Sequence, residues 1–277
     1  MVYNANNEAG NSISSEIIAS TCEKLRTLGL NCDASFVAEW ALINSADMRT
    51  IKALESFASM LRKKYDERLI GMLLQMSRLP IPNARSFDSF DGSRMTADNR
   101  DMISALRSLT FMEAGTNVVI YGDEGTGKTH IAQAIGLESC LQKKKAIFYR
   151  AAELKAAIRR HIDKGRENEF TKSISATPCL IVDEIDKCSF DKQESMVFFQ
   201  IVDKRYEKRF GAMVFTSNKK PSEWGASFSE SYIAKCIMDR IFDRCINIEM
   251  RGESFRGKDR KSFKLNFGNS PYITGLE

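Results

Sequence analysis

The sequence contains no long apolar run and no cysteine arrangement typical of an exported or metal-binding protein. The first residues, Met1–Asn7, lack the basic and apolar regions of a signal peptide, and no apolar stretch approaches membrane-spanning length. The seven cysteines include no C-x-x-C pair, and the chain has only two histidines. These absences argue against a disulfide framework and a zinc site. We therefore expect a cytoplasmic protein with reduced, mostly buried thiols.

Proline is also scarce, because the chain has five prolines and none precedes Pro80. Residues 12–77 show a helical pattern, with Asp33 as a predicted helix cap. The apolar residues of this pattern, which we expect to form the core of a small bundle, are Phe36, Trp40, Ile43, Ile51, Leu54, Ala58, Leu61, Tyr65, Leu69, Met72 and Met76. Pro80 and Pro82 mark a linker. We predict an N-terminal helical domain over 1–84 and a second domain over 85–277.

From Phe87 onward, short β-type runs alternate with helical stretches, which is typical of a parallel α/β sheet. The predicted strands are Asn117–Tyr121, Ala146–Arg150, Cys179–Val182, Ala212–Thr216 and Cys245–Glu249. Only a mostly polar stretch follows the fifth strand, so a full helical lid domain does not fit there.

The sequence GDEGTGKT at Gly122–Thr129 matches the phosphate-loop pattern G-x-x-x-x-G-K-[ST]. An apolar run precedes it and a helix-like stretch follows, which is the context that the chemistry requires. The loop N–H groups and the helix N-terminus bind phosphates, Lys128 reaches the β- and γ-phosphates, and the Thr129 hydroxyl completes a Mg²⁺ site. The predicted ATP-binding residues are Gly122, Asp123, Glu124, Gly125, Thr126, Gly127, Lys128, Thr129 and His130.

Polar groups follow two of the later predicted strands. The strand CLIV ends in Asp183 and Glu184, and one predicted strand separates it from the phosphate loop. We predict that Asp183 holds Mg²⁺ together with Thr129 and that Glu184 activates the attacking water. Asn218, after the strand ending in Thr216, is placed to orient that water near the γ-phosphate.

Cations occur at two further places that bear on function. Arg240 and Arg244 stand one helical turn apart. An arginine from a neighbouring subunit can stabilise the transition state of phosphoryl transfer, and either residue is a candidate for this role. A surface Asp–Arg pair is the competing interpretation. The predicted DNA-binding residues are Lys143, Lys144, Lys145, Lys155, Arg159, Arg160 and Arg166, and a solvated helix face is the competing interpretation. Lys155, Arg159 and Arg166 share an arc if one helix spans 152–166. The tail adds Arg251, Arg256, Lys258, Arg260, Lys261 and Lys264.

Together these motifs resemble the IstB-type transposition helper ATPases, AAA+ proteins of the same clade as the DnaC helicase loaders. The resemblance runs from about Cys22 to Arg256. It rests on Phe87-Asp-Ser-Phe-Asp91, GDEGTGKTHIAQAIG, CLIVDE, Arg205-Tyr-Glu207, Thr216-Ser-Asn-Lys219, Glu223-Trp224, Met238-Asp-Arg240 and Gly252-Glu-Ser-Phe-Arg256. His130 and Trp224 favour the IstB type. The family's usual S-Y-R is here Ser254-Phe-Arg256, and a histidine is frequent where Arg244 stands, so either arginine is a candidate finger.

The resemblance implies an AAA+ fold: a parallel five-stranded sheet flanked by helices, after a small all-α domain and with little or no lid. It assigns Lys128 and Thr129 to Walker A, Asp183 and Glu184 to Walker B, Asn218 to sensor 1 and Arg240 to the arginine finger. It also implies an ATP- and Mg²⁺-dependent ATPase that oligomerises on double-stranded DNA, deforms it and recruits a partner transposase.

Two other readings remain open from the sequence. One is a DnaC-like helicase loader, whose N-terminal helices bind a replicative helicase. The other is a P-loop nucleotide-binding protein with no role on DNA.

Overall fold

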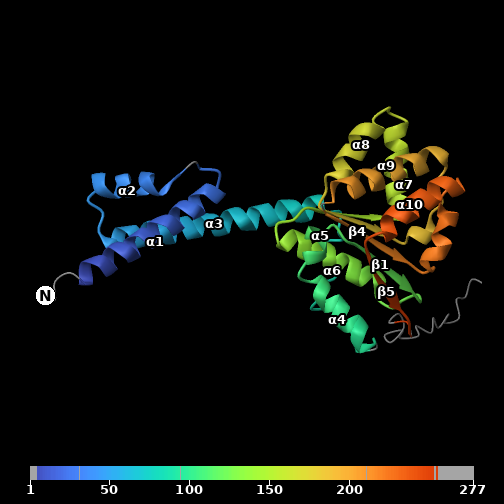
Figure 1. Cartoon of the computed structure of the whole chain (residues 1–277), viewed down its shortest axis with the longest axis horizontal. Helices are drawn as coiled ribbons and strands as arrows, with labels where there is room; N and C mark the ends of the chain where they lie inside the picture. Colours follow the sequence, from blue (N-terminus) through green and yellow to red (C-terminus); the bar gives the residue numbers. More distant parts are fainter. Residues whose placement is uncertain (1–4, 31, 94, 210, 253, 255–277) are drawn as a thin grey trace, which may run out of the picture.

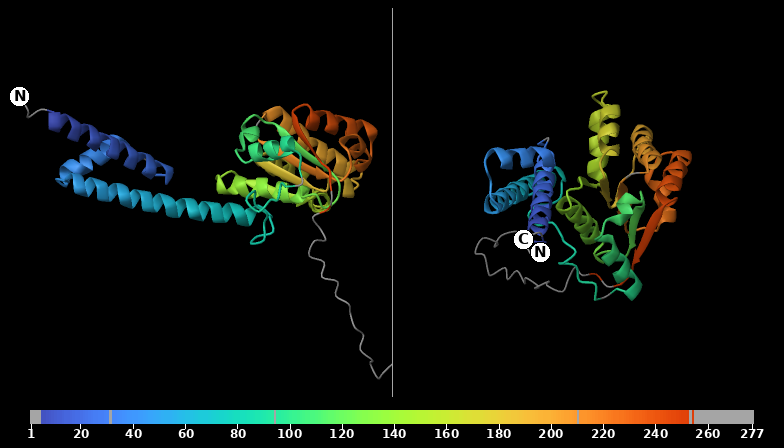
Figure 2. Two further views of the ribbon diagram at one scale, coloured as in Figure 1. Left: turned by 90° about the horizontal axis from the view of Figure 1, so that it is seen from below. Right: turned by 60° about the vertical axis from the view of Figure 1, so that its left-hand side comes forward.

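The computed structural model describes residues 5–30, 32–93, 95–209, 211–252 and 254 (Figure 1). An arm of three helices, α1 (Ala5–Thr27), α2 (Ala34–Ile43) and α3 (Met48–Met76), extends from a domain built on a parallel sheet. Figure 2 shows the same arm projecting from the sheet domain when the molecule is turned. The predicted cap at Asp33 is confirmed, because its carboxylate accepts a hydrogen bond from the Phe36 amide.

Inside the arm, α1 packs along the N-terminal part of α3 and a small core forms around Cys22, Cys32 and Val37. The predicted bundle core is only partly correct. Ile51 and Ala58 are buried, whereas the Phe36 and Ile43 side chains are 61% and 73% exposed. Farther along the same stripe Leu61, Tyr65, Met72 and Met76 are also exposed. The short α1–α2 hairpin covers only one part of α3, so these four side chains face solvent, whereas Leu69 packs against the sheet domain.

The last turns of α3 belong to the packing of the sheet domain. Leu73 and Leu79 are buried in the same apolar cluster as the sheet, and the Phe148 amide donates to the Ser77 carbonyl over 2.8 Å. The predicted boundary at 84/85 remains a prediction, but the chain already contacts the second domain before that point.

The predicted five-stranded parallel sheet is confirmed. Its strands are β1 (Asn117–Gly122), β2 (Ala146–Arg150), β3 (Cys179–Asp183), β4 (Ala212–Ser217) and β5 (Cys245–Met250). The strand order is β2-β3-β4-β1-β5, and every pairing is parallel. The apolar runs of β1, β3 and β4 are buried, as expected of strands covered on both faces.

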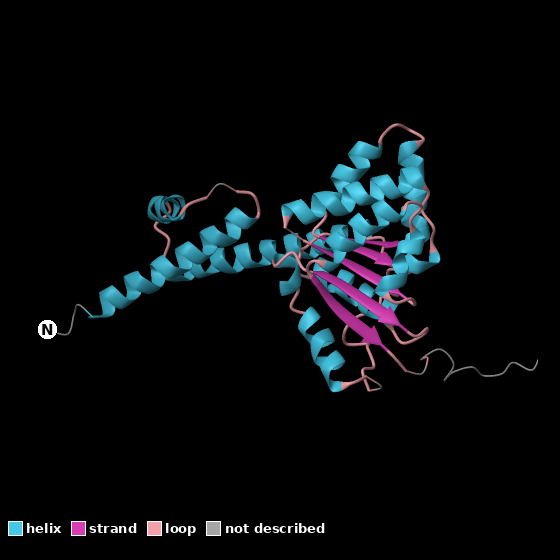
Figure 3. Cartoon of the chain, turned by 45° about the vertical axis from the view of Figure 1, so that its right-hand side comes forward, coloured by secondary structure: helices cyan, strands magenta, loops and turns pink. Residues whose placement is uncertain are grey.

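Helices cover both faces of the sheet, as Figure 3 shows. Four of them pack with the alternate strand residues that include Leu180 and Phe215: α7 (Ala151–Ile162), α8 (Glu167–Ser175), α9 (Lys192–Lys208) and α10 (Ser231–Phe242). The opposite cluster, which includes Ile120 and Ile181, takes α4 (Ala97–Leu106), α5 (Thr110–Glu113), α6 (Lys128–Leu141) and the end of α3. Short 3₁₀ helices, η1 (Ile185–Lys187) and η2 (Pro221–Ser227), follow β3 and β4.

Two details of the sequence interpretation change at the edges of this fold. A single helix over 152–166 is wrong: α7 ends at Ile162, Gly165 adopts φ +62°, and Arg166 stands at the start of α8. The lid prediction concerns the chain after β5. Residues 251, 252 and 254 contain no helix or strand, and the remaining tail, with Arg256, Lys258, Arg260, Lys261 and Lys264, lies outside the described residues.

Candidate nucleotide-binding site

The phosphate loop connects the carboxyl end of β1 to the start of α6. Gly122 and Gly127 have φ of +130° and +98°, which side chains with a Cβ rarely adopt. A Cβ on Gly122 would overlap the Met250 carbonyl oxygen, and one on Gly127 would meet the Phe90 ring at 2.9 Å. The loop therefore needs glycine at both positions. Thr126 closes the turn by donating its hydroxyl to the Asp123 carbonyl over 2.8 Å.

The Lys128 ammonium folds back onto this loop and donates to the carbonyls of Gly122 and Asp123, at 2.8 and 2.5 Å. Burial lowers the pKa of Lys128 from its ordinary value, because the charged form loses solvation. A phosphate bound in the loop would give the Lys128 ammonium a full negative charge as its partner, whereas the loop carbonyls offer only partial charges.

His130 joins α6 to the segment before α4. Its Nε2 atom lies 2.8 Å from the Ser86 carbonyl oxygen and 3.1 Å from the Ser89 hydroxyl, and its ring meets Phe90 edge to face. Burial lowers the pKa of the imidazole. His130 therefore holds the segment 86–90 over the phosphate loop.

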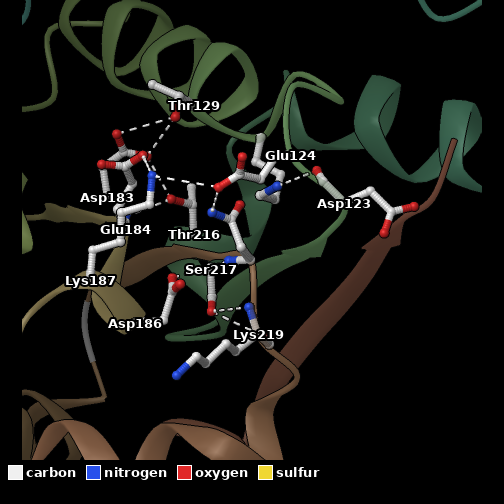
Figure 4. Close-up of polar contacts among 12 residues, drawn as sticks. Asp123, Glu124, Thr129, Asp183, Glu184, Asp186, Lys187, Thr216, Ser217 and Lys219 are labelled. Carbon is white, nitrogen blue, oxygen red and sulfur yellow. Dashed lines mark hydrogen bonds and ion pairs between the residues drawn. The ribbon is translucent and has the colours of Figure 1, made fainter. Parts of the chain in front are cut away.

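The centre of the site is the Asp183 carboxylate at the end of β3 (Figure 4). Thr129 donates its hydroxyl to Asp183 Oδ1 and Oδ2 at 2.9 and 3.2 Å, and Thr216 on β4 donates to Oδ1 at 2.5 Å. Burial raises the pKa of Asp183, while the two hydroxyl donors act in the opposite direction. Asp183 and Thr129 thus lie together as a hydroxyl and a carboxylate, the protein ligands that Mg²⁺ takes beside a bound polyphosphate.

Glu184 follows with a left-handed backbone conformation, φ +58° and ψ +49°. Its amide donates to the Thr216 hydroxyl at 2.9 Å, so one threonine fixes both adjacent acids. The Glu184 carboxylate pairs with Lys187 at 2.7 Å, as Figure 4 shows. The two neighbouring acids therefore have different surroundings, as expected for different roles.

Asn218 reaches the phosphate loop from the end of β4. Its side-chain amide donates to Glu124 Oε1 at 3.1 Å, and its backbone amide donates to Asp186 Oδ1 at 3.1 Å. Trp224 is fully buried and donates its indole N–H to the Lys219 carbonyl at 3.1 Å. This tryptophan fixes the chain immediately after Asn218.

An open cavity of about 610 Å³ connects these groups. Its lining includes Gly125, Gly127, Lys128, Thr129, His130, Glu124, Glu184 and Asn218, together with Arg85, Ser89, Phe90, Asp91, Gln133, Lys187, Thr216 and Ser217. Most predicted ATP-binding residues and the catalytic candidates Glu184 and Asn218 thus share one cavity, and Asp183 contacts it through Thr129 and Thr216. No role was predicted from the sequence for Thr216, Lys187 or Arg85. The only sequence signal for Thr216 was the run of small polar residues at the end of β4.

Arg240 and Arg244 do not lie in this cavity. They line a small pocket with Gly115, Asn117 and Gly211, which stand at the amino ends of β1 and β4, on the opposite edge of the sheet. Arg240 pairs with Asp203 at 2.5 Å and lies over the Phe199 ring, whereas Arg244 is 3.8 Å from Asp243.

The predicted DNA-binding residues are mostly engaged in ion pairs within the chain. The pairs are Lys143–Asp66, Lys144–Glu113, Lys155–Glu194, Arg159–Asp191, Arg159–Glu194 and Arg166–Glu169. Arg160 donates to the Ala156 carbonyl, Lys145 is half-buried, and Arg251 of the tail pairs with Glu249. These acids offset much of the charge that the sequence shows as a basic stretch.

Fold and site together define an ATP-binding protein of the AAA+ class. The sheet is similar to that of DnaI, with a TM-score of 0.51 at 22% identity over 62% of this chain and 96% of that structure. It is also similar to the DnaC helicase loader, with a TM-score of 0.50 at 17% identity over 61% and 98% of the two chains. The replication initiator DnaA gives 0.51 at 21%, over 62% of this chain and about half (51%) of that one. Identities this low establish the fold alone.

The sequence comparisons identify the family. The model of the IstB-like ATP binding protein family matches residues 23–263, and the chain belongs to this family. The ATP-binding protein of insertion sequence IS21 from Pseudomonas aeruginosa is 27% identical over 86% of this chain and 89% of its own length. That of IS232 from Bacillus thuringiensis subsp. berliner is 29% identical over 76% and 83%. The resemblance found in the motifs is therefore confirmed. Within the described part of the chain, no helix is both long and apolar enough to cross a membrane.

Proposed function

We propose that this protein is an ATPase that regulates DNA transposition by assembling on double-stranded DNA when ATP is bound. The observation that carries the proposal is the Thr129–Asp183–Thr216–Glu184 arrangement beside the phosphate loop, in a chain of the IstB-like family. The insertion-sequence relatives support a role in transposition. The assembly would deform the DNA and recruit a transposase, which carries out strand transfer.

The residues of the site divide the work of hydrolysis. Loop amides and Lys128 bind the phosphates, and Thr129 and Asp183 would hold Mg²⁺, which would supply charge neutralisation for the reacting phosphate. Glu184 accepts the proton of the attacking water, and Asn218 orients that water from β4. Thr216 keeps Asp183 and the Glu184 backbone in place through its single hydroxyl.

The position of Arg240 supports the proposal that a neighbouring subunit completes the site. Because Arg240 lies at the edge of the sheet away from its own cavity, it acts on a nucleotide only when that nucleotide is bound to another subunit. Mixing Arg240→Ala subunits with Glu184→Gln subunits tests this: each is inactive alone, and the mixture should regain ATPase activity in trans. Arg244→Ala mixed with the same partner is the matched comparison, and restoration of activity there only would assign the finger to Arg244.

Electron microscopy on long duplex DNA tests the assembly. With ATP and Mg²⁺, and without a required sequence, the protein should form large DNA-bound oligomers, and Glu184→Gln should make them long-lived. Absence of DNA-dependent oligomers in the presence of ATP would contradict the proposal. Preference for single strands together with co-purification of a hexameric helicase would instead favour a helicase loader.

Charge reversal identifies the DNA contacts. Arg160→Glu is the informative variant, because the Arg160 side chain has no acidic partner among the described ion pairs, whereas Arg159 pairs with the buried Glu194 and its reversal would disturb the fold. Arg160→Glu should weaken duplex binding and reduce its salt dependence by about one phosphate contact. Unchanged salt dependence would exclude Arg160 from the interface.

A further inference from the structure

Lys187 is the last residue of η1, the short 3₁₀ helix that follows Asp183 and Glu184. Its ammonium lies 2.7 Å from Glu184 Oε1 and 4.0 Å from Glu124 Oε1. It also lines the cavity that contains Lys128 and Thr129. One cation thus stands between the proposed base and an acidic residue of the phosphate loop, as the close-up in Figure 4 shows for Lys187, Glu184 and Glu124.

The two acids of this corner, Glu184 and Glu124, are unfavourable neighbours for a triphosphate, and Lys187 is the cation paired with Glu184 and closest to Glu124 among the described ion pairs. Glu184 and Glu124 both face the cavity, and two carboxylates repel the polyanion that the loop binds. The hydrogen bond to Glu184 raises the pKa of Lys187, so the side chain stays protonated at neutral pH. Lys187 therefore offsets negative charge at the place where the terminal phosphate enters.

The ion pair is easily exchanged for another partner. The Lys187 side chain is 46% exposed, and water screens an ion pair of this kind. Glu124 keeps a second donor, the Asn218 amide, when the lysine moves. Among the described residues, Lys187 is the ion-pair partner of Glu184, so its departure leaves that carboxylate able to accept a proton. A terminal phosphate carries more negative charge than one carboxylate and competes well for the ammonium.

We propose that Lys187 binds the terminal phosphate of the nucleoside triphosphate and that its move to this phosphate releases Glu184 for catalysis. The water oxygen then bonds to the terminal phosphorus, the bond from phosphorus to the bridging oxygen of ADP breaks, and Glu184 takes the water proton. While Lys187 pairs with Glu184, it neutralises that carboxylate. The inference rests on the proposed ATP hydrolysis at this site, and it adds a residue that distinguishes ATP from ADP.

Calorimetry with a non-hydrolysable ATP analogue and with ADP, both with Mg²⁺, tests the contact on the full chain. Lys187→Met should weaken analogue binding about 10-fold or more, the loss expected for a charge-assisted hydrogen bond, and should change ADP binding less than about 2-fold. Lys187→Arg keeps the charge and should retain most of the preference. Lys192→Met is the matched control, because Lys192 forms an exposed pair with Glu230 and does not line the cavity. Equal effects on analogue and ADP, or no effect, would overturn the proposal.

Two further measurements separate this inference from the proposed function. The melting temperature of Lys187→Met should equal that of the parent, and its turnover number for ATP should fall together with analogue affinity. If the parent assembles on DNA and hydrolyses ATP while Lys187→Met keeps the parent's preference for the analogue over ADP, the inference alone fails. If the parent neither assembles nor hydrolyses but Lys187→Met still loses analogue affinity selectively, the contact stands and the proposed function fails.

Discussion

Replacement of Thr216 by valine should uncouple the two acids of the site without altering its shape. The Thr216 hydroxyl is buried, donates to Asp183 at 2.5 Å and accepts from the Glu184 amide at 2.9 Å. Valine fills the same volume but makes neither hydrogen bond. A residue that orients a metal ligand typically contributes 10- to 100-fold to metal affinity, so the half-saturating Mg²⁺ concentration for ATP binding should rise by about that factor. The unsatisfied Glu184 amide adds a loss of about 1–3 kcal/mol in stability.

Titration of Mg²⁺ against a fixed concentration of ATP, followed by nucleotide binding, measures this effect. Thr216→Ser keeps the hydroxyl and should stay near the parent. Ser217→Ala controls for the neighbouring hydroxyl, which donates to the Lys219 carbonyl instead. If Thr216→Val needs no more than about 2-fold more Mg²⁺ than the parent, Thr216 does not orient Asp183 in the loaded site and the reasoning is refuted.

Three other changes test the site and its support. Lys128→Ala should abolish MgATP binding in calorimetry while the protein stays folded. Asp183→Asn should raise the melting temperature of the nucleotide-free protein, since burial raises the pKa of this acid and its charged form therefore costs stability once pH exceeds that raised pKa; a lower melting temperature would contradict this. Arg205→Met should lower the free energy of unfolding, measured in urea, by about 2–4 kcal/mol. The buried guanidinium donates to four carbonyls. After its loss, the Ile174 and Pro178 carbonyls still accept from backbone amides, so the cost comes from the other two.

The sheet and the phosphate loop were predictable because short-range chemistry determines them. Strands such as β3 are continuous apolar runs that only a doubly covered sheet buries, and all five were placed to within one residue at their ends. The loop has a spacing imposed by its backbone, with glycine required at Gly122 and Gly127. Their positions in the sequence therefore predicted their positions in the fold.

Features that depend on partners distant in the sequence were not predictable in the same way. The stripe on α3 has the same periodicity where it is buried, at Ala58, and where it is exposed, at Met72, because periodicity does not tell which face finds a neighbour. The basic residues give a second example. Lys143 pairs with Asp66, 77 positions earlier in the chain, and such long-range pairing removes charge that a linear reading counts as free. Gly165 is a third case, since its left-handed conformation ends α7 inside a pattern that otherwise continues.

The polar groups proposed for hydrolysis all have partners within the described part of the chain. Lys128 donates to loop carbonyls, Glu184 pairs with Lys187, Asn218 bonds to Glu124, and Arg240 pairs with Asp203. A nucleotide must exchange these contacts for its own, and each exchange is favourable only where the new contact is the stronger one. ADP would offer its phosphates to the loop and Lys128, whereas we propose that the other three groups respond to a third phosphate or to a neighbouring subunit's nucleotide. We therefore expect assembly to depend on ATP more steeply than binding to a single subunit does.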